Sequence, residues 1–349
     1  MLLLLASPQL VSPNDVDGWL WQGGQDSGRA LPGGDWQQLY RFVHIAKTAG
    51  TSFLRDARQH LSNRTALVGA EDCYKNIRSG NNVYFEKLGL GPGTTREGAT
   101  PVHMSAFLRF PRAHVLSLFL ECKYDRWGKT LTKQRGPFAA NSYASDMAAF
   151  GAWMLYFTSP SWSPREAHGD FDCYNPWNMQ SRHFVCSGSY PYLAHHALVG
   201  TKPTPLVPPM DEVQHSFDRM EWVGITELYH ESLCVFHYGM FAALPLGCDC
   251  AASSATQNHK RDTHETHHVP KHDVAEYPAD LLALIDTVTV RDHQLYIRGV
   301  GRFIDRARSV ERATRIRIIC PAKLAKVDAL VEVSKRAVSA AIARGAAAA

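Results

Sequence analysis

Apolar residues in this chain form two kinds of pattern, short continuous runs and longer stretches with a helical period. Continuous runs occupy residues 39–45, 102–108 and 222–225, and they have the length and composition of strands buried on both faces. A stretch of apolar positions at helical spacing follows each run along the chain. Strands that alternate with helices predict an α/β domain with a mainly parallel central sheet.

The same pattern divides the chain into segments. Residues 1–38 are rich in Gly, Pro, Asp and Trp without a sustained period, so we expect an irregular leader there. Helical spacing returns at residues 145–157 and 280–308, and we place the domain at residues 39–308. Residues 309–349 are basic and alanine-rich, and this tail is expected either to be helical or to be dispensable.

Composition and charge narrow the class of protein. The chain has 349 residues, of which 45% are hydrophobic, and its formal net charge is +4. This is ordinary globular composition. The mild charge argues against a nucleic-acid partner, which normally requires a concentrated basic face.

Cysteines and the first residues bear on the cellular compartment. Eight cysteines permit disulfides without requiring them, and no C-x-x-C pair points to a zinc ribbon. Cys248 and Cys250 are too close to bridge each other easily, so each needs another partner or stays a thiol. The first residues, MLLLLASPQL, read either as a poor secretory signal or as the remainder of one. With the glycosylation sequon at Asn63, they suggest a lumenal glycoprotein that associates with a membrane through that segment.

The sharpest motif is RFVHIAKTAGTSFLRD, in which a buried strand gives way to a short turn and then to a helix. Amides at a helix start lack partners within the helix and the dipole adds positive charge, so such a turn can bind a phosphate group. Gly50 lets the chain approach an anion closely, Lys47 adds a full charge, and Thr48, Thr51 and Ser52 offer hydroxyls. The alternative is an exposed lysine beside a helix cap. The nucleotide loop G-x-x-x-x-G-K-[ST] is absent, which favours a single 5′-phosphate over a triphosphate held with magnesium.

The stretch VHIAKTAGTSF resembles the 5′-phosphosulfate loop of sulfotransferases that use 3′-phosphoadenosine 5′-phosphosulfate. The resemblance is greatest to carbohydrate sulfotransferases of the heparan sulfate 2-O and 6-O type, although Ala46 replaces their usual Pro or Gln. It implies a P-loop-like, three-layer α/β domain. It also implies a donor-binding loop made of Lys47, Thr48, Ala49, Gly50, Thr51 and Ser52.

The same family carries an arginine at the end of a later strand and a serine eight residues on. The stretch FLRFPRAHVLSLF supplies Arg109 and Ser117, and the resemblance implies that both bind the 3′-phosphate of the donor. A parallel strand would deliver Arg109 to the carboxyl edge of the sheet, and a guanidinium binds phosphate oxygens in pairs. Phe110 departs from the polar residue usual there. A third stretch, VGITELYHESLCVF, resembles the family segment that follows the substrate-binding region.

Sulfuryl transfer is an in-line displacement in which the protein mainly positions the partners and stabilises developing negative charge. Lys47 is expected to bind the bridging oxygen and help 3′,5′-adenosine diphosphate leave, without a metal. Family members use a histidine or glutamate as the base for the acceptor hydroxyl. No motif assigns that base here; His103 and Glu86 are the candidates, and His103 could equally be a histidine at a strand start. His44 is expected to be a buried structural residue.

The acceptor side is less specific. The stretch CYNPWNMQSRHF offers aromatic and amide groups suited to a sugar, and we expect Asn178 and Arg182 to contact the acceptor. Five histidines crowd the loop at residues 247–272, which is expected to be either a solvated loop or a lid over the site. Their spacing matches no known class of metal site.

The motifs together imply a sulfotransferase of the Golgi lumen or membrane that moves a sulfuryl group to a hydroxyl, with a carbohydrate as the expected acceptor; a cytoplasmic location is the alternative. Two related alternatives are an inactive nucleotide- or glycan-binding protein and a sulfotransferase of small alcohols. A P-loop kinase would need a lysine after the glycine. A glycosyltransferase would rest on the D-x-D string at residues 170–172, which recurs at residues 15–17.

Overall fold

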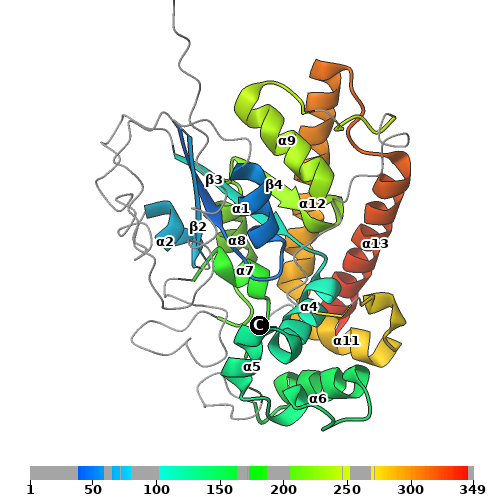
Figure 1. The fold of residues 1–349 in the computed structure, drawn as a ribbon. Helices are drawn as coiled ribbons and strands as arrows, with labels where there is room; N and C mark the ends of the chain where they lie inside the picture. Colours follow the sequence, from blue (N-terminus) through cyan, green and yellow to red (C-terminus); the bar gives the residue numbers. More distant parts are fainter. Residues whose placement is uncertain are drawn as a thin grey trace, which may run out of the picture.

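The computed structural model describes residues 38–58, 65–70, 72–79, 102–162, 171, 173–186, 205–245, 247–251, 269–270 and 272–344 (Figure 1), and the structure below is that of these residues.

A parallel sheet forms the centre of the described fold. Its strands are β1 (Gln38–Val43), β2 (Thr65–Ala70), β3 (Val102–Leu108) and β4 (Trp222–Ile225), in the order β2-β1-β3-β4. The pairing aligns Val43 with Ala106 and Leu108 with Ile225, all in parallel register. The three predicted strands are confirmed, whereas β2 was missed because its sequence, TALVGA, is short and rich in small residues.

Helices cover both faces of this sheet. On one face lie α1 (Gly50–Arg58) and α9 (Tyr229–Phe241), where the Phe53 ring packs 5.0 Å from the rings of Trp222 and Phe236. On the other face, α12 (Val290–Thr314) packs against β4, α7 (Met179–His183) and α8 (Met210–Phe217). Gly299 of α12 touches Leu108 so closely that a Cβ would overlap it. The three-layer α/β fold is therefore confirmed.

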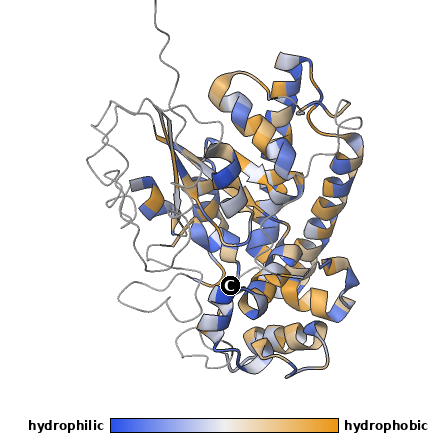
Figure 2. Ribbon diagram, viewed as in Figure 1, coloured by the Kyte–Doolittle hydropathy of each residue, from blue (hydrophilic) through white to orange (hydrophobic). Residues whose placement is uncertain are grey.

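A second group of helices packs beyond the carboxyl ends of the strands, below the sheet in Figure 1. It contains α4 (Pro111–Tyr124), α5 (Arg126–Thr132), α6 (Asp146–Thr158) and α11 (Ala279–Val288). Most residues of α6 are apolar (Figure 2), and Phe150, Trp153 and Phe157 are buried against the neighbouring helices. The loops that follow β1, β3 and β4 meet in the region between these helices and the edge of the sheet.

The last helix packs against the rest of the domain. The domain end that we expected after residue 308 falls inside α12, and α13 (Pro321–Ala343) packs along α12. Val327 of α13 is 1% exposed and joins the main hydrophobic cluster. The described part of the tail is therefore helical and packed, and the expectation of a dispensable end is not supported.

All eight cysteines form disulfides, which pair Cys73 with Cys186, Cys122 with Cys173, Cys234 with Cys248, and Cys250 with Cys320. Cys248 is therefore bonded to α9 through Cys234, whereas Cys250 is bonded to Cys320, directly before α13. Among the helices that the structure describes, none is long and apolar enough to cross a membrane.

Candidate functional site

The loop between β1 and α1 is a tight hook. Lys47 and Ala49 both have positive φ, 62° and 71°. The amide and the hydroxyl of Thr48 donate to the Ile45 carbonyl at 3.3 and 2.8 Å, which turns the chain back on itself. The hook ends at Gly50, where α1 begins without an acidic residue in its first turn. As in any α-helix, the first amides have no acceptor within the helix, which is what an anion site requires.

Packing requires a glycine at position 50, a requirement that the sequence did not reveal. A Cβ at this position would overlap the His44 ring and lie 2.9 Å from Cε1 of Phe42. His44 is 4% exposed, in keeping with the buried structural role expected of it. The glycine is thus required for close packing against β1, whatever the loop binds.

Three consecutive carbonyls of the hook accept hydrogen bonds from distant segments. Nε2 of His114, on α4, donates to the Ala46 oxygen at 2.8 Å. Nη1 of Arg109 donates to the Lys47 oxygen at 3.0 Å. The hydroxyl of Thr226, directly after β4, lies 2.9 Å from the Thr48 oxygen and 3.1 Å from the Leu108 oxygen. The hook is therefore held by the ends of β3 and β4 and by α4.

Arg109 is anchored at the end of β3 by its own backbone. Its amide donates to Oε1 of Gln180 at 2.9 Å, and Nε2 of Gln180 donates back to its carbonyl at the same distance. The next amide, that of Phe110, donates to Glu227. Burial lowers the pKa of Arg109, while the negative charge of Glu227 opposes that shift. An arginine stays charged under these conditions, so a fixed cation sits beside the hook.

Lys47 itself pairs with a carboxylate. Its Nζ lies 3.4 Å from Oε1 of Glu121 on α4, and the two side chains are 12% and 2% exposed. The second carboxylate oxygen of Glu121 accepts from the Tyr174 hydroxyl at 3.0 Å. Ser117 lies one turn earlier on α4 and is 3% exposed. The sequence interpretation missed Glu121, although its spacing of four from Ser117 places both on one face of a helix.

The two candidate bases are not brought to the hook. His103 lies near the amino end of β3, where its ring stacks on Tyr40 at 4.8 Å. Six residues of strand separate it from Arg109, which is about 20 Å. Its position gives no support to the base role. Glu86 lies outside the described residues.

The two residues expected to contact the acceptor are buried instead. Asn178 is 0% exposed, and its side chain donates to the Leu206 carbonyl and accepts from the amide of Arg291. Arg182 is 1% exposed, and burial lowers its pKa to about 10 while Asp292 opposes the shift. Asn178 therefore fixes the start of α12, and neither side chain reaches an acceptor from this position. Both expectations are corrected.

A cavity of about 850 Å³ lies between α2 (Tyr74–Ser79), the end of α7 and α8. Its lining mixes aromatic, basic and acidic side chains, including Tyr74, Arg78, Phe184 and Glu212. No residue of the hook lines it.

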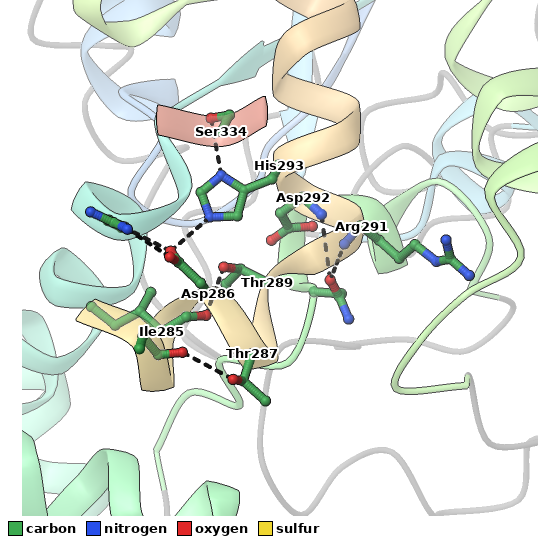
Figure 3. Close-up of polar contacts among 11 residues, drawn as sticks. Ile285, Asp286, Thr287, Thr289, Arg291, Asp292, His293 and Ser334 are labelled. Carbon is green, nitrogen blue, oxygen red and sulfur yellow. Dashed lines mark hydrogen bonds and ion pairs between the residues drawn. The ribbon is translucent and has the colours of Figure 1, made fainter. Parts of the chain in front are cut away.

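A second polar cluster has the composition of a hydrolase triad (Figure 3). Nε2 of His293 donates to Asp286 at 3.1 Å, Nδ1 accepts from the Ser334 hydroxyl at 3.0 Å, and Arg112 grips Asp286 with two hydrogen bonds. Ser334 and His293 are both 0% exposed, so a substrate has no access to this hydroxyl. The cluster joins α4, α11, α12 and α13 and is a structural clamp.

One group of side chains has the donor atoms of a metal site. His230, Cys234 and Cys248 have ligand atoms within 4.8 Å of one another. The two sulfurs are bonded to each other, so neither is available as a thiolate. This group does not fit a metal ion.

Comparison with protein-family models, with curated proteins and with solved structures gives no match. What the fold and the site define is a three-layer α/β domain with a lysine-bearing hook before a helix, and a second cation fixed beside it at the carboxyl edge of the sheet.

Proposed function

We propose that this protein transfers a sulfuryl group from 3′-phosphoadenosine 5′-phosphosulfate to a hydroxyl on a carbohydrate. The observation that carries the proposal is the contact between the two motifs. Arg109 stands 62 positions from Lys47 in the chain, yet its guanidinium donates to the Lys47 carbonyl at 3.0 Å. One ligand with a phosphate at each end could therefore meet both cations.

The hook and the start of α1 supply groups for the 5′ end of the donor. The first-turn amides, which lack acceptors within the helix, and the Lys47 ammonium favour an anion, and Thr51 and Ser52 add hydroxyls. Arg109 is the proposed partner of the 3′-phosphate together with Ser117 on α4. A fixed guanidinium suits that role because its planar fork binds two phosphate oxygens at once.

Lys47 is the proposed leaving-group residue. It would exchange its contact with Glu121 for the bridging oxygen between sulfur and the 5′-phosphate. Charge that develops on this oxygen during transfer would then be neutralised by the ammonium group. In this proposal lysine, arginine and backbone amides neutralise the donor, and no metal takes part.

The disulfides support an oxidising compartment for this activity. Paired cysteines are typical of secreted, lumenal and surface proteins and are rare in the cytosol. We therefore propose the Golgi lumen, where the donor and unfinished glycans would meet the enzyme.

Calorimetry tests the donor. The expected result is binding of 3′,5′-adenosine diphosphate with no comparable binding of ATP or of a nucleotide sugar. Preference for either of the latter would overturn the proposal in favour of a kinase or a glycosyltransferase. Transfer from radiolabelled donor to a glycan panel tests the reaction, and tight nucleotide binding without any turnover would indicate an inactive binding module.

A further inference from the structure

The backbone of the hook alternates between two conformations. The φ angles of Lys47 and Ala49 are positive, 62° and 71°, whereas that of Thr48 between them is negative. Such an alternation turns successive amides to one side of the chain, where they can surround an anion, and leaves the carbonyls on the other side. The groups that hold these carbonyls therefore decide where the amides point.

Thr226 holds one of these carbonyls and the end of a second strand at the same time. It is the first residue of the short 3-10 helix Thr226–Leu228, directly after β4. Its single hydroxyl hydrogen is shared between the Thr48 carbonyl at 2.9 Å and the Leu108 carbonyl at 3.1 Å. Leu108 immediately precedes Arg109, so one hydroxyl links the hook to the strand end that carries the second cation.

Glu227 fixes the other side of Arg109. Its Oε1 accepts from the amide of Phe110 at 2.9 Å, and its Oε2 accepts from the Tyr296 hydroxyl of α12 at 3.2 Å. The residues before and after Arg109 are thus both held by the dipeptide that follows β4, while Gln180 holds the amide and the carbonyl of Arg109 itself. The guanidinium therefore extends from a backbone that is fixed on both sides.

We propose that Thr226 is a positioning residue for sulfuryl transfer, supported by Glu227, and that it sets the separation between the amides of the hook and the guanidinium of Arg109. This separation is also that of the two proposed phosphate sites, so the inference rests on the proposed function. A ligand held at both ends gains affinity only where both sites match its length. In-line transfer further requires that the reacting atoms stay aligned.

The direct contact between Arg109 and the hook is less suited to this role. It uses the same guanidinium that is proposed to bind the 3′-phosphate, so it can change when the donor binds. Thr226 instead bonds to backbone carbonyls at both ends, and neither bond has to break for the donor to bind. The hydroxyl can therefore keep the two sites in place throughout the reaction.

The test compares Thr226→Ala with Thr226→Ser, which both lose the same methyl group, although only serine keeps the hydroxyl. The control is Thr158→Ala, because the Thr158 hydroxyl likewise contacts two carbonyls, those of Met154 at 2.9 Å and Leu155 at 3.4 Å, at the end of α6. Calorimetry on the full chain uses three probes. One is 3′,5′-adenosine diphosphate, and the others are adenosine 5′-phosphate and adenosine 3′-phosphate, which each carry a single phosphate.

We expect Thr226→Ala to weaken binding of 3′,5′-adenosine diphosphate by about 10-fold and to leave the affinity for each monophosphate within about twofold of the wild type. Turnover at saturating radiolabelled donor should fall by about 10- to 100-fold. Thr226→Ser and Thr158→Ala should match the wild type in nucleotide binding and turnover. A purely structural role would lower the melting temperature of Thr226→Ala without this difference between the nucleotides.

The inference would be overturned by wild-type affinity and turnover in Thr226→Ala, by an equal loss of affinity for all three nucleotides, or by the same losses in Thr226→Ser or Thr158→Ala. If Thr226→Ala does not fold, Thr226→Val, which keeps the shape of threonine, decides by the same criteria. A wild-type protein that binds 3′,5′-adenosine diphosphate no more tightly than the monophosphates, or not at all, would instead refute the proposed function.

Discussion

Replacing Lys47 by alanine should impair both stability and transfer. The ammonium and the Glu121 carboxylate are 3.4 Å apart and are 12% and 2% exposed, which corresponds to an attraction of about 5 kcal/mol at an effective dielectric constant of about 20. Removing the lysine recovers its own desolvation cost but leaves the carboxylate buried beside the Tyr174 hydroxyl. We therefore expect Lys47→Ala to lower the free energy of unfolding by about 3 kcal/mol.

The matched control is Lys47→Ala combined with Glu121→Gln. The glutamine amide is neutral and can still accept from the Tyr174 hydroxyl, so the buried charge disappears with its partner. We expect the double variant to unfold within about 1 kcal/mol of the wild type. Neither variant should transfer sulfate, because both lack the cation that we propose stabilises the leaving group.

Urea unfolding followed by circular dichroism, without reducing agent, measures the stability term, and transfer from radiolabelled donor measures activity. If Lys47→Ala were as stable as the wild type, the ion pair would contribute nothing and the buried-charge argument would fail. Sulfate transfer at the wild-type rate by this variant would remove Lys47 from the leaving-group role.

Three further predictions concern the hook and its supports. Arg109→Ala should weaken binding of 3′,5′-adenosine diphosphate by about 2 kcal/mol, or roughly 30-fold in calorimetry, with unchanged affinity as the contrary result. Gly50→Ala should cost about 1–3 kcal/mol in urea unfolding because its Cβ would overlap His44, and an undisturbed variant would contradict that packing. Burial lowers the pKa of His114 to about 3, so only the unfolded chain takes up this proton between pH 6.5 and pH 3, and stability is lost as pH falls through that window. His114→Gln can keep the bond to Ala46 without titrating, so it should lose about 2 kcal/mol less than the wild type between pH 7 and pH 5 in urea unfolding, and equal losses would refute the assignment.

Local patterns were sufficient for most of the sheet and its helices. The strands predicted at residues 102–108 and 222–225 have these bounds in the structure, and a helix begins at Pro111 as expected. Each of these elements has a strong apolar run or a proline that acts within a few residues. Strand β2 was missed because its small residues carry no such signal and it is held by pairing with β1.

The candidate site was predictable only in part. The hook and Arg109 follow from short motifs, because backbone amides and a strand end position their groups locally. The failures are long-range in origin. Asn178 and Arg182 are polar residues of the kind expected on a surface, yet α12 covers them. The side chain of Asn178 accepts a hydrogen bond from the amide of Arg291, which is 113 positions away in the chain.

The sequence by itself determined a parallel α/β fold and a turn suited to an anion, since apolar periodicity and turn chemistry act between near neighbours. Only the tertiary structure decided that Lys47 faces Glu121 and that Arg109 reaches the hook. The physical reason is that these contacts depend on how the sheet edge and the helix group beyond it close on each other, and packing of distant segments leaves no local mark in a single sequence.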